Sequence, residues 1–181
     1  MKFLIIGASG SGTTTLAKAL SEATSFPHLD IDDFYWKSTN PPYQIKVTSE
    51  ERKENLQTDF EKHANIIVSG SLVSWGTYWE TAFDLVVFVT LDKEIRMQRL
   101  QQREVARYGD KLQIDPIIQE RSQAFLAWAK RYDDPTFTGR SVKIHRDWLR
   151  SLSCEIVEID SEDSIKNNVL KVLAIFFNHK S

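Results

Sequence analysis

The chain alternates between short apolar runs and longer stretches in which apolar residues recur at helical spacing. Short, continuously apolar runs are typical of strands that are buried on both faces of a parallel sheet. They predict strands at residues 2–7, 28–32, 66–70, 85–91 and 154–159. Strands that alternate with helices in this way predict an α/β fold, with a parallel sheet and helices on both of its faces.

Helix-start signals lie in the gaps between these runs. Thr48 followed by Glu51 forms a capping box, and Asp115 followed by Pro116 is typical of a first helical turn. We therefore predict helices from about residue 12 and at 48–64, 93–107, 116–132 and 161–177. Residues 104–140 lie between the fourth and fifth predicted strands and contain no predicted strand, so we expect a lid-like helical insert there.

Composition narrows the class of protein. With 181 residues and 41% apolar composition, the chain is long enough for one domain, 1–181, with its own core. A net charge of −2 does not indicate a nucleic-acid partner, and no apolar run approaches the ~20 residues of a membrane span. Because a strand is predicted from residue 2, we expect no signal peptide. The single cysteine, Cys154, favours a structural role and a reducing, cytoplasmic location.

The first predicted strand runs straight into the segment Gly-Ala-Ser-Gly-Ser-Gly-Thr-Thr, residues 7–14. A strand followed by G-x-x-x-x-G-K-[ST] and a helix is the pattern of a phosphate-binding loop, in which backbone N–H groups and the helix N-terminus hold the anion. Thr13 stands where this pattern has lysine. The segment predicts binding of nucleotide phosphates, and the alternative is a glycine-rich turn in an ordinary α/β domain.

Carboxylates follow the second predicted strand. Ligands in such folds lie beyond the carboxyl ends of the strands, so residues there are candidates for chemistry. Asp30 and Asp32 are two positions apart, which in an extended chain places both side chains on one side. They could hold Mg²⁺ beside substrate phosphates, and Asp32 in particular could accept a proton from a hydroxyl nucleophile. The alternative is an acidic segment that caps the next element.

Other residues near strand ends leave alternatives open. The aromatic run 34–36 either lines a substrate pocket or packs in the core, and Gly70 either allows close approach of a ligand or forms a plain turn. Phe125 and Trp128 lie on an apolar helical stripe that we expect in the core. The four histidines do not cluster as metal ligands do, so we expect surface or core roles for them.

A basic stripe follows the fourth predicted strand. Spacings of three and four residues put four arginines on one helix face: Arg96, Arg99, Arg103 and Arg107. Guanidinium groups along one face form an anion clamp, although Glu94 and Glu104 could pair with some of them. If that face borders the loop, an arginine could supply the charge of the missing lysine.

With the loop, the aspartates and the arginine stripe, the chain resembles the small P-loop kinases, which include adenylate, shikimate and gluconate kinases. Residues 10–16, Gly-Ser-Gly-Thr-Thr-Thr-Leu, are similar to the loop of a group of bacterial adenylate-kinase-like proteins. The resemblance implies a three-layer P-loop NTPase fold with a five-stranded parallel sheet, and binding of ATP with Mg²⁺. It implies that the phosphates are held by Gly7, Ser9, Gly10, Ser11, Gly12, Thr13, Thr14 and Thr15.

The resemblance also implies roles outside the backbone of the loop. It gives the Mg²⁺ ligands as Thr14, Asp30 and Asp32. Asp32 looks like the group that serves the phosphoryl acceptor. Arg99 and Arg103 look like the nucleotide-clamping arginines at the start of a lid, and Arg140 looks like the arginine on the far side of that lid.

Together these observations predict transfer of the γ-phosphoryl group of ATP to an unidentified small-molecule acceptor, a nucleoside monophosphate or another small metabolite. Asp32 would orient or deprotonate the acceptor, and the arginines would neutralise developing charge. Thr13 favours two alternatives, because the loop lysine normally contacts the β- and γ-phosphate oxygens. These are a non-catalytic nucleotide-binding protein that acts as a switch, and a slow ATPase.

Overall fold

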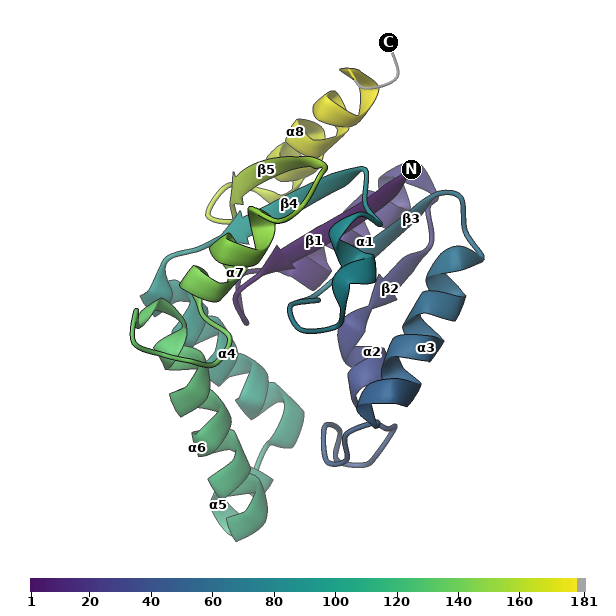
Figure 1. Cartoon of the computed structure of the whole chain (residues 1–181). Helices are drawn as coiled ribbons and strands as arrows, with labels where there is room; N and C mark the ends of the chain where they lie inside the picture. The colour runs from purple at the N-terminus through teal and green to yellow at the C-terminus, as the bar shows by residue number, and fades with distance from the viewer. Residues whose placement is uncertain (179–181) are drawn as a thin grey trace.

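A five-stranded parallel sheet forms the centre of the computed structural model, which describes residues 1–178 (Figure 1). The strands are β1 (Lys2–Gly7), β2 (His28–Asp30), β3 (Ile66–Ser69), β4 (Leu85–Thr90) and β5 (Glu155–Asp160). They lie in the order β2-β3-β1-β4-β5, and each neighbouring pair is parallel. The central strand is therefore β1, whose carboxyl end lies between the ends of β3 and β4.

Helices connect the strands. The α-helices are α1 (Thr13–Thr24), α2 (Ile31–Tyr35), α3 (Ser49–Glu61), α4 (Lys93–Tyr108), α5 (Lys111–Ile114), α6 (Pro116–Lys130), α7 (Val142–Leu149) and α8 (Ile165–Asn178). Two short 3₁₀ segments are η1 (Thr77–Glu80) and η2 (Arg131–Asp133).

The core consists of two apolar layers, one on each face of the sheet. Leu4 and Ile6 of β1 pack in the layer that α3 covers with Phe60. Phe3 and Ile5 pack in the other layer, with side chains of α1 and α8. This division follows from the two-residue period of a strand, which sends successive side chains to opposite faces. The loop that follows β1 therefore starts from a strand that is buried on both sides.

The predicted fold class and all five predicted strands are confirmed. The end of β2 differs, because β2 stops at Asp30 and α2 begins at Ile31. Asp30 Oδ1 accepts a hydrogen bond from the Asp32 N–H at 3.0 Å and so caps α2. The expectation that Asp30 and Asp32 share one side of an extended chain is therefore wrong.

Two helices also differ from the prediction. No helix is predicted at residues 142–149, yet the Ser141 hydroxyl caps α7 there, and α7 buries His145 and Leu149. The last helix begins at Ile165 rather than at residue 161, and the Ser164 hydroxyl accepts a hydrogen bond from the Asn167 N–H. Each of these starts has a serine cap, which is a signal that the sequence carries.

The region 104–140 contains no strand, as predicted. It consists of the end of α4 followed by α5, α6 and η2, and Figure 1 shows these helices extending away from the sheet. Within the region, α6 packs on both α4 and α5. No helix in residues 1–178 is long and apolar enough to cross a bilayer.

Candidate functional site

The loop after β1 contains two positions that favour glycine. Gly10 and Gly12 have φ angles of 84° and 96°. A Cβ atom at Gly10 would lie 2.9 Å from the Arg96 carbonyl oxygen, and one at Gly12 would lie 3.0 Å from Ser161 Oγ. The chain passes from Gly12 directly into α1, whose N-terminus has no side-chain cap. A glycine-rich loop that opens onto a free helix N-terminus is suited to bind phosphate.

Thr14, in the first turn of α1, links the loop to the end of β2. Its Oγ1 donates a hydrogen bond to Asp30 Oδ2 at 2.9 Å. Mg²⁺ prefers oxygen ligands, and in nucleotide sites it takes one or two protein carboxylates beside phosphates and waters. Thr14 and Asp30 therefore fit a Mg²⁺ site of that kind. Across residues 1–178, no group of three or more His, Cys, Asp or Glu residues could hold a metal ion by itself.

Two cavities meet at the loop. The smaller has a volume of about 390 Å³ and the larger has a volume of about 750 Å³. Both cavities are lined by Gly10, Thr13, Thr14 and Arg103, which we call the shared wall. A molecule in one cavity would meet a molecule in the other at the N-terminus of α1, beside the position where the loop lysine is missing.

The smaller cavity extends from the loop to the segment that follows β5. Arg99 of α4 lines it and donates a hydrogen bond from Nη1 to Ser161 Oγ at 3.3 Å. Ile165 and Asn168 of α8 line its far side. The cavity thus joins the glycine-rich loop to a wall with apolar and polar side chains, which is an arrangement suited to a nucleotide.

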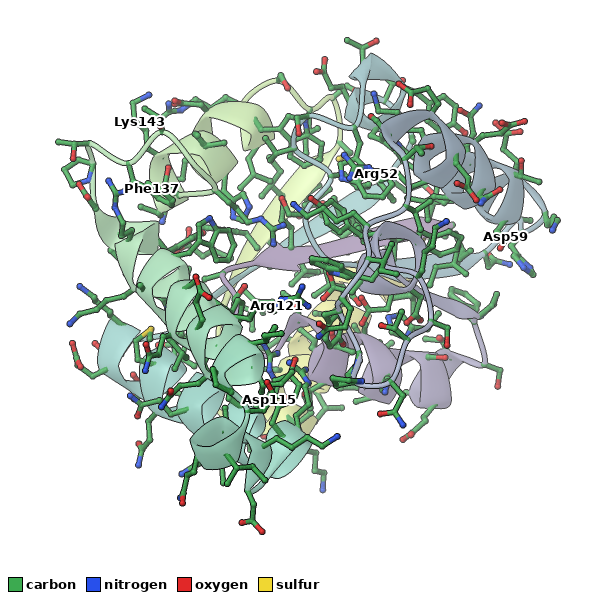
Figure 2. All side chains as sticks on the ribbon, turned by 90° about the horizontal axis from the view of Figure 1, so that it is seen from below. Arg52, Asp59, Asp115, Arg121, Phe137 and Lys143 are labelled. Carbon is green, nitrogen blue, oxygen red and sulfur yellow. The ribbon has the colours of Figure 1, made fainter. Side chains whose placement is uncertain are left out.

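Aromatic and cationic side chains line the larger cavity. The aromatic residues are Tyr35, Trp36, Tyr43, Trp75, Tyr108, Phe125 and Trp128. The cations are Lys46, Arg103, Arg107, Arg121 and Arg140. Within residues 1–178, no carboxylate forms an ion pair with Arg103, Arg121 or Arg140, so these charges are available to an anion. Seen from below in Figure 2, Arg121 lies on the side of α6 that faces the rest of the molecule.

Asp32 brings a carboxylate into the larger cavity from α2. The carboxylate is open to the cavity, but the surrounding protein removes much of its water. This burial raises the pKa of Asp32, and the charge of Asp30 raises it further, while Arg140 and Arg103 oppose the rise. A carboxylate with a raised pKa in a cavity is suited to accept a proton from a hydroxyl nucleophile.

The arginines of α4 do not act as one clamp, because Arg96 faces the interior. It is 1% exposed, forms an ion pair with Asp133 and stacks on the Tyr132 ring at 5.0 Å. It therefore joins α4 to η2. The sequence-based placement of Arg96 on an anion-binding face is wrong, because the partner that buries it lies 37 residues further along the chain.

The other three arginines of α4 lie at different places in the site. Arg99 lines the smaller cavity, and Arg103 belongs to the shared wall. Arg107 lines the larger cavity, where it pairs with Glu104 at 2.8 Å and stacks on the Tyr43 ring at 4.4 Å. Along α4, Arg99, Arg103 and Arg107 thus lie in turn at the smaller cavity, the shared wall and the larger cavity.

Arg140 lies in the larger cavity, in the segment between η2 and α7. Its guanidinium group stacks over the Trp128 ring at 5.3 Å. Burial lowers the pKa of Arg140, and the nearby carboxylate of Asp32 opposes that change. Arg140 and Asp32 both line this cavity, so one bound ligand could contact both of them.

Several lining residues were expected elsewhere or left open by the sequence. Phe125 and Trp128 were expected in the core, but they line the larger cavity. Together with Arg121 they lie on one face of α6, at spacings of four and three residues. The arginine in this otherwise aromatic stripe is the sequence signal that the face lines a cavity rather than the core. Tyr35 and Trp36 also line the larger cavity, whereas Phe34 packs against the core. Gly70 borders the cavity too, but a Cβ atom there would lie 2.9 Å from the Ile31 side chain, so packing alone requires glycine.

Hydrogen bonding holds two of the histidines in the fold, and packing holds the cysteine. His28 Nε2 lies 2.8 Å from Ser69 Oγ, and His145 is fully buried between two hydroxyl groups. Cys154 packs against the core, and burial raises the pKa of its thiol, in agreement with a structural role. His179 lies outside the described residues.

The parallel sheet order, the loop after β1 and the helices around it define a P-loop protein with the fold of the small-molecule kinases. The chain belongs to the AAA domain family, which matches residues 4–123.

Relatives and solved structures agree with this class. YqaC of Bacillus subtilis, itself described as uncharacterised, is 37% identical over 169 residues that cover 93% of each chain. Cytidylate kinase of Archaeoglobus fulgidus is 30% identical over 115 residues, which cover 58% of this chain and 62% of that protein. Shikimate kinase of Aquifex aeolicus has the same fold, with a TM-score of 0.55 and 16% identity over 99% of this chain and 98% of that chain.

Proposed function

We propose that this protein transfers the γ-phosphoryl group of ATP to a small acceptor that carries an anionic group and a flat ring. The first candidate is a nucleoside monophosphate, and another anionic metabolite is the next. The observation that carries this proposal is the shared wall, because it joins two cavities at a phosphate-binding loop. The smaller cavity would hold ATP, and the larger would hold the acceptor.

The lining of the larger cavity supports an acceptor of this chemistry. Aromatic side chains stack on flat rings, and guanidinium groups without a carboxylate partner bind phosphate or carboxylate oxygens. Lys46 adds a further cation, which lies 5.6 Å and 5.7 Å from the ring centres of Tyr35 and Trp36. A purely apolar acceptor would leave these cations without a counter-charge.

Each element of the site has a role in this proposal. Thr14 and Asp30 would hold Mg²⁺, which neutralises phosphate charge when it is bound. The N–H groups of the loop would hold the phosphates of ATP. Asp32 would orient the nucleophilic oxygen of the acceptor and take its proton where it carries one. Arg103, on the shared wall, would face the charge that develops on the transferred group.

Thr13 favours a second candidate function, in which the protein binds a nucleotide without transferring phosphate. An ADP-release assay with wild-type protein and Mg·ATP separates the two functions. The assay would use a panel of nucleoside monophosphates, nucleosides and small hydroxy acids as acceptors. We expect at least one phosphate-bearing acceptor to raise ADP release above the rate with ATP alone. Calorimetric binding of ATP without acceptor-stimulated release would support the second function, and acceptor-independent release would indicate a slow ATPase.

Replacing Gly12 with valine should weaken ATP binding by ~10-fold or more, a loss of about 1.4 kcal/mol. A branched side chain is strained at a φ of 96°, and its Cβ would approach Ser161 Oγ and Arg99 in the smaller cavity. Isothermal titration calorimetry gives the Kd. Gly76→Val is the matched control, because Gly76 has a φ of 116° but nothing within 4 Å of its Cβ position. An unchanged Kd for Gly12→Val would contradict phosphate binding at this loop.

A further inference from the structure

A chain of three hydrogen-bonding side chains reaches the larger cavity from the interior. Tyr132 Oη lies 2.8 Å from His145 Nδ1, and His145 Nε2 lies 3.0 Å from Ser71 Oγ. Tyr132 belongs to η2, His145 belongs to α7, and Ser71 follows β3. Tyr132, His145 and Ser71 are all buried, with exposures of 7%, 0% and 6%, and of the three only Ser71 lines the cavity. The row of hydrogen-bonded side chains therefore ends where a bound acceptor would lie.

His145 is neutral in these surroundings. Burial, together with the charge of Arg140, lowers the pKa of His145 to about 3. A neutral imidazole has one donor nitrogen and one acceptor nitrogen, so the three hydrogen-bonded side chains can donate in only one of two directions, toward Ser71 or toward Tyr132. Burial also raises the pKa of Tyr132, so its phenol keeps its proton.

The buried phenol decides between the two directions. Within residues 1–178, the only hydrogen-bond partner of Tyr132 Oη is His145 Nδ1. A proton on Nδ1 would leave the Tyr132 hydroxyl as a buried donor without an acceptor, which costs free energy. With the proton on Nε2, Tyr132 donates to Nδ1, and Nε2 donates to Ser71 Oγ. The proton of the Ser71 hydroxyl is then free to point into the cavity.

We infer that Tyr132 and His145 are positioning residues that hold Ser71 as a hydrogen-bond donor toward an oxygen atom of the bound acceptor. The inference rests on the proposed function, because it takes the larger cavity as the acceptor cavity. Ser71 would contact the ligand directly, and the other two residues would act through it. A ligand at the end of β3 must then present a lone pair, from a phosphate, carboxylate or hydroxyl oxygen.

Nitrogen-15 NMR of the imidazole rings tests the direction of the chain without any ligand. Long-range proton–nitrogen correlation spectra distinguish the two tautomers, and comparison with His145→Gln assigns the His145 signals. We expect the proton on Nε2 in the wild type. In Tyr132→Phe the donor to Nδ1 is lost, so a larger fraction of His145 should carry its proton on Nδ1. A proton on Nδ1 in the wild type, or an unchanged tautomer in Tyr132→Phe, would overturn the inference.

Binding measurements test the contact with the ligand. Calorimetry with CMP, cytidine and shikimate identifies the probe that binds the wild type most tightly and distinguishes a phosphate from a hydroxyl contact. Ser71→Ala should weaken that binding by ~3–10-fold, as expected for one hydrogen bond. Tyr132→Phe should weaken it in the wild type but not in the Ser71→Ala background, since it acts through Ser71. Additive effects would show a merely structural role and would overturn the inference.

Ser69→Ala is the matched control, because Ser69 also bonds to a histidine but does not line the cavity. It should leave the Kd of the probe unchanged. If none of the three probes binds the wild type, or if Ser71→Ala binds as tightly as the wild type, the donor has no contact to serve and the inference fails. Failure of the proposed function is a separate result, in which the probes bind and depend on Ser71 while no acceptor stimulates ADP release.

Discussion

Replacing Asp32 with asparagine should lower phosphoryl transfer to an acceptor with a hydroxyl nucleophile by ~100-fold or more, because general bases contribute ~10²–10⁴-fold to the rate. Asparagine keeps the shape of the side chain but cannot take a proton from the acceptor. Asp32 is suited to this role by its place in the larger cavity and by the opposing effects on its pKa, which burial raises and Arg140 lowers. The loss should appear in kcat more than in the affinity for ATP, whose proposed contacts lie on the other side of the shared wall.

The thermal stability of Asp32→Asn should not fall with its kcat, and we expect it to stay the same or rise. Burial, and then the charge of Asp30, raise the pKa of Asp32 above its ordinary value of 3.8. The folded state therefore binds that proton more tightly than the unfolded state does. Stability falls as the pH rises from 3.8 through the raised pKa, and the loss persists above it. At neutral pH, Asp32→Asn removes this cost, so its Tm should equal or exceed that of the wild type, whereas the difference should vanish below pH 3.8.

Both quantities should be measured on the same preparations, as kcat with the best hydroxyl acceptor of the panel and as Tm by scanning calorimetry at several pH values. Asp33→Asn is the control, because Asp33 is the neighbouring carboxylate on α2 but lines neither cavity. It should keep its kcat. A large fall in Tm for Asp32→Asn, with kcat unchanged per folded molecule, would assign the carboxylate a structural role instead.

The apolar pattern predicts the sheet well because each strand is specified by its own residues. β1 and β4 are buried on both faces, so residues 3–6 and 85–89 are apolar without interruption. The loop is also a local signal, since two glycines with positive φ and the Thr14 hydroxyl fall within one short segment. Asp30 shows the limit of this approach, because its side chain forms a cap that stops the strand.

The candidate site was harder to predict because its walls come from distant segments. Tyr35, Trp75 and Trp128 line one cavity, yet each follows a different strand. Helical spacing correctly puts Arg96 and Arg103 on one face of α4, but the two side chains meet different parts of the fold. Arg96 meets Asp133 in the interior, whereas Arg103 reaches the shared wall. Periodicity identifies the residues that share a face but not what that face meets.

Replacing Arg103 with alanine should lower kcat by ~100-fold or more, since removing one preorganised donor from transition-state charge costs ~10²–10³-fold. Of the arginines in residues 1–178, only Arg103 lines both cavities. It forms no ion pair within that part of the chain, so its charge is available at the shared wall. Burial, and then the charge of Arg107, lower its pKa, but a guanidinium keeps its proton at neutral pH.

Thr13→Lys separates two explanations for the missing loop lysine. Thr13 belongs to the shared wall with Arg103, so a lysine there would place a second cation beside the first. Like charges repel, and we expect no gain in turnover in the wild-type background. In the Arg103→Ala background, the same lysine should raise kcat by ~10-fold or more, because it returns a cation to the wall. Rescue of this kind would show that Arg103 has taken the place of the lysine.

The control for these variants is Arg150→Ala, because Arg150 is an exposed arginine that pairs with Asp147 and lines neither cavity. It should leave kcat unchanged. A gain in turnover for Thr13→Lys alone would mean that the loop lacks a cation that nothing else supplies. If Arg103→Ala keeps its kcat, and Thr13→Lys folds but changes kcat in neither background, the shared wall has no compensated catalytic charge. Nucleotide binding without phosphoryl transfer would then be the preferred function, because the loop and Thr14 could still hold ATP while the developing charge had no partner.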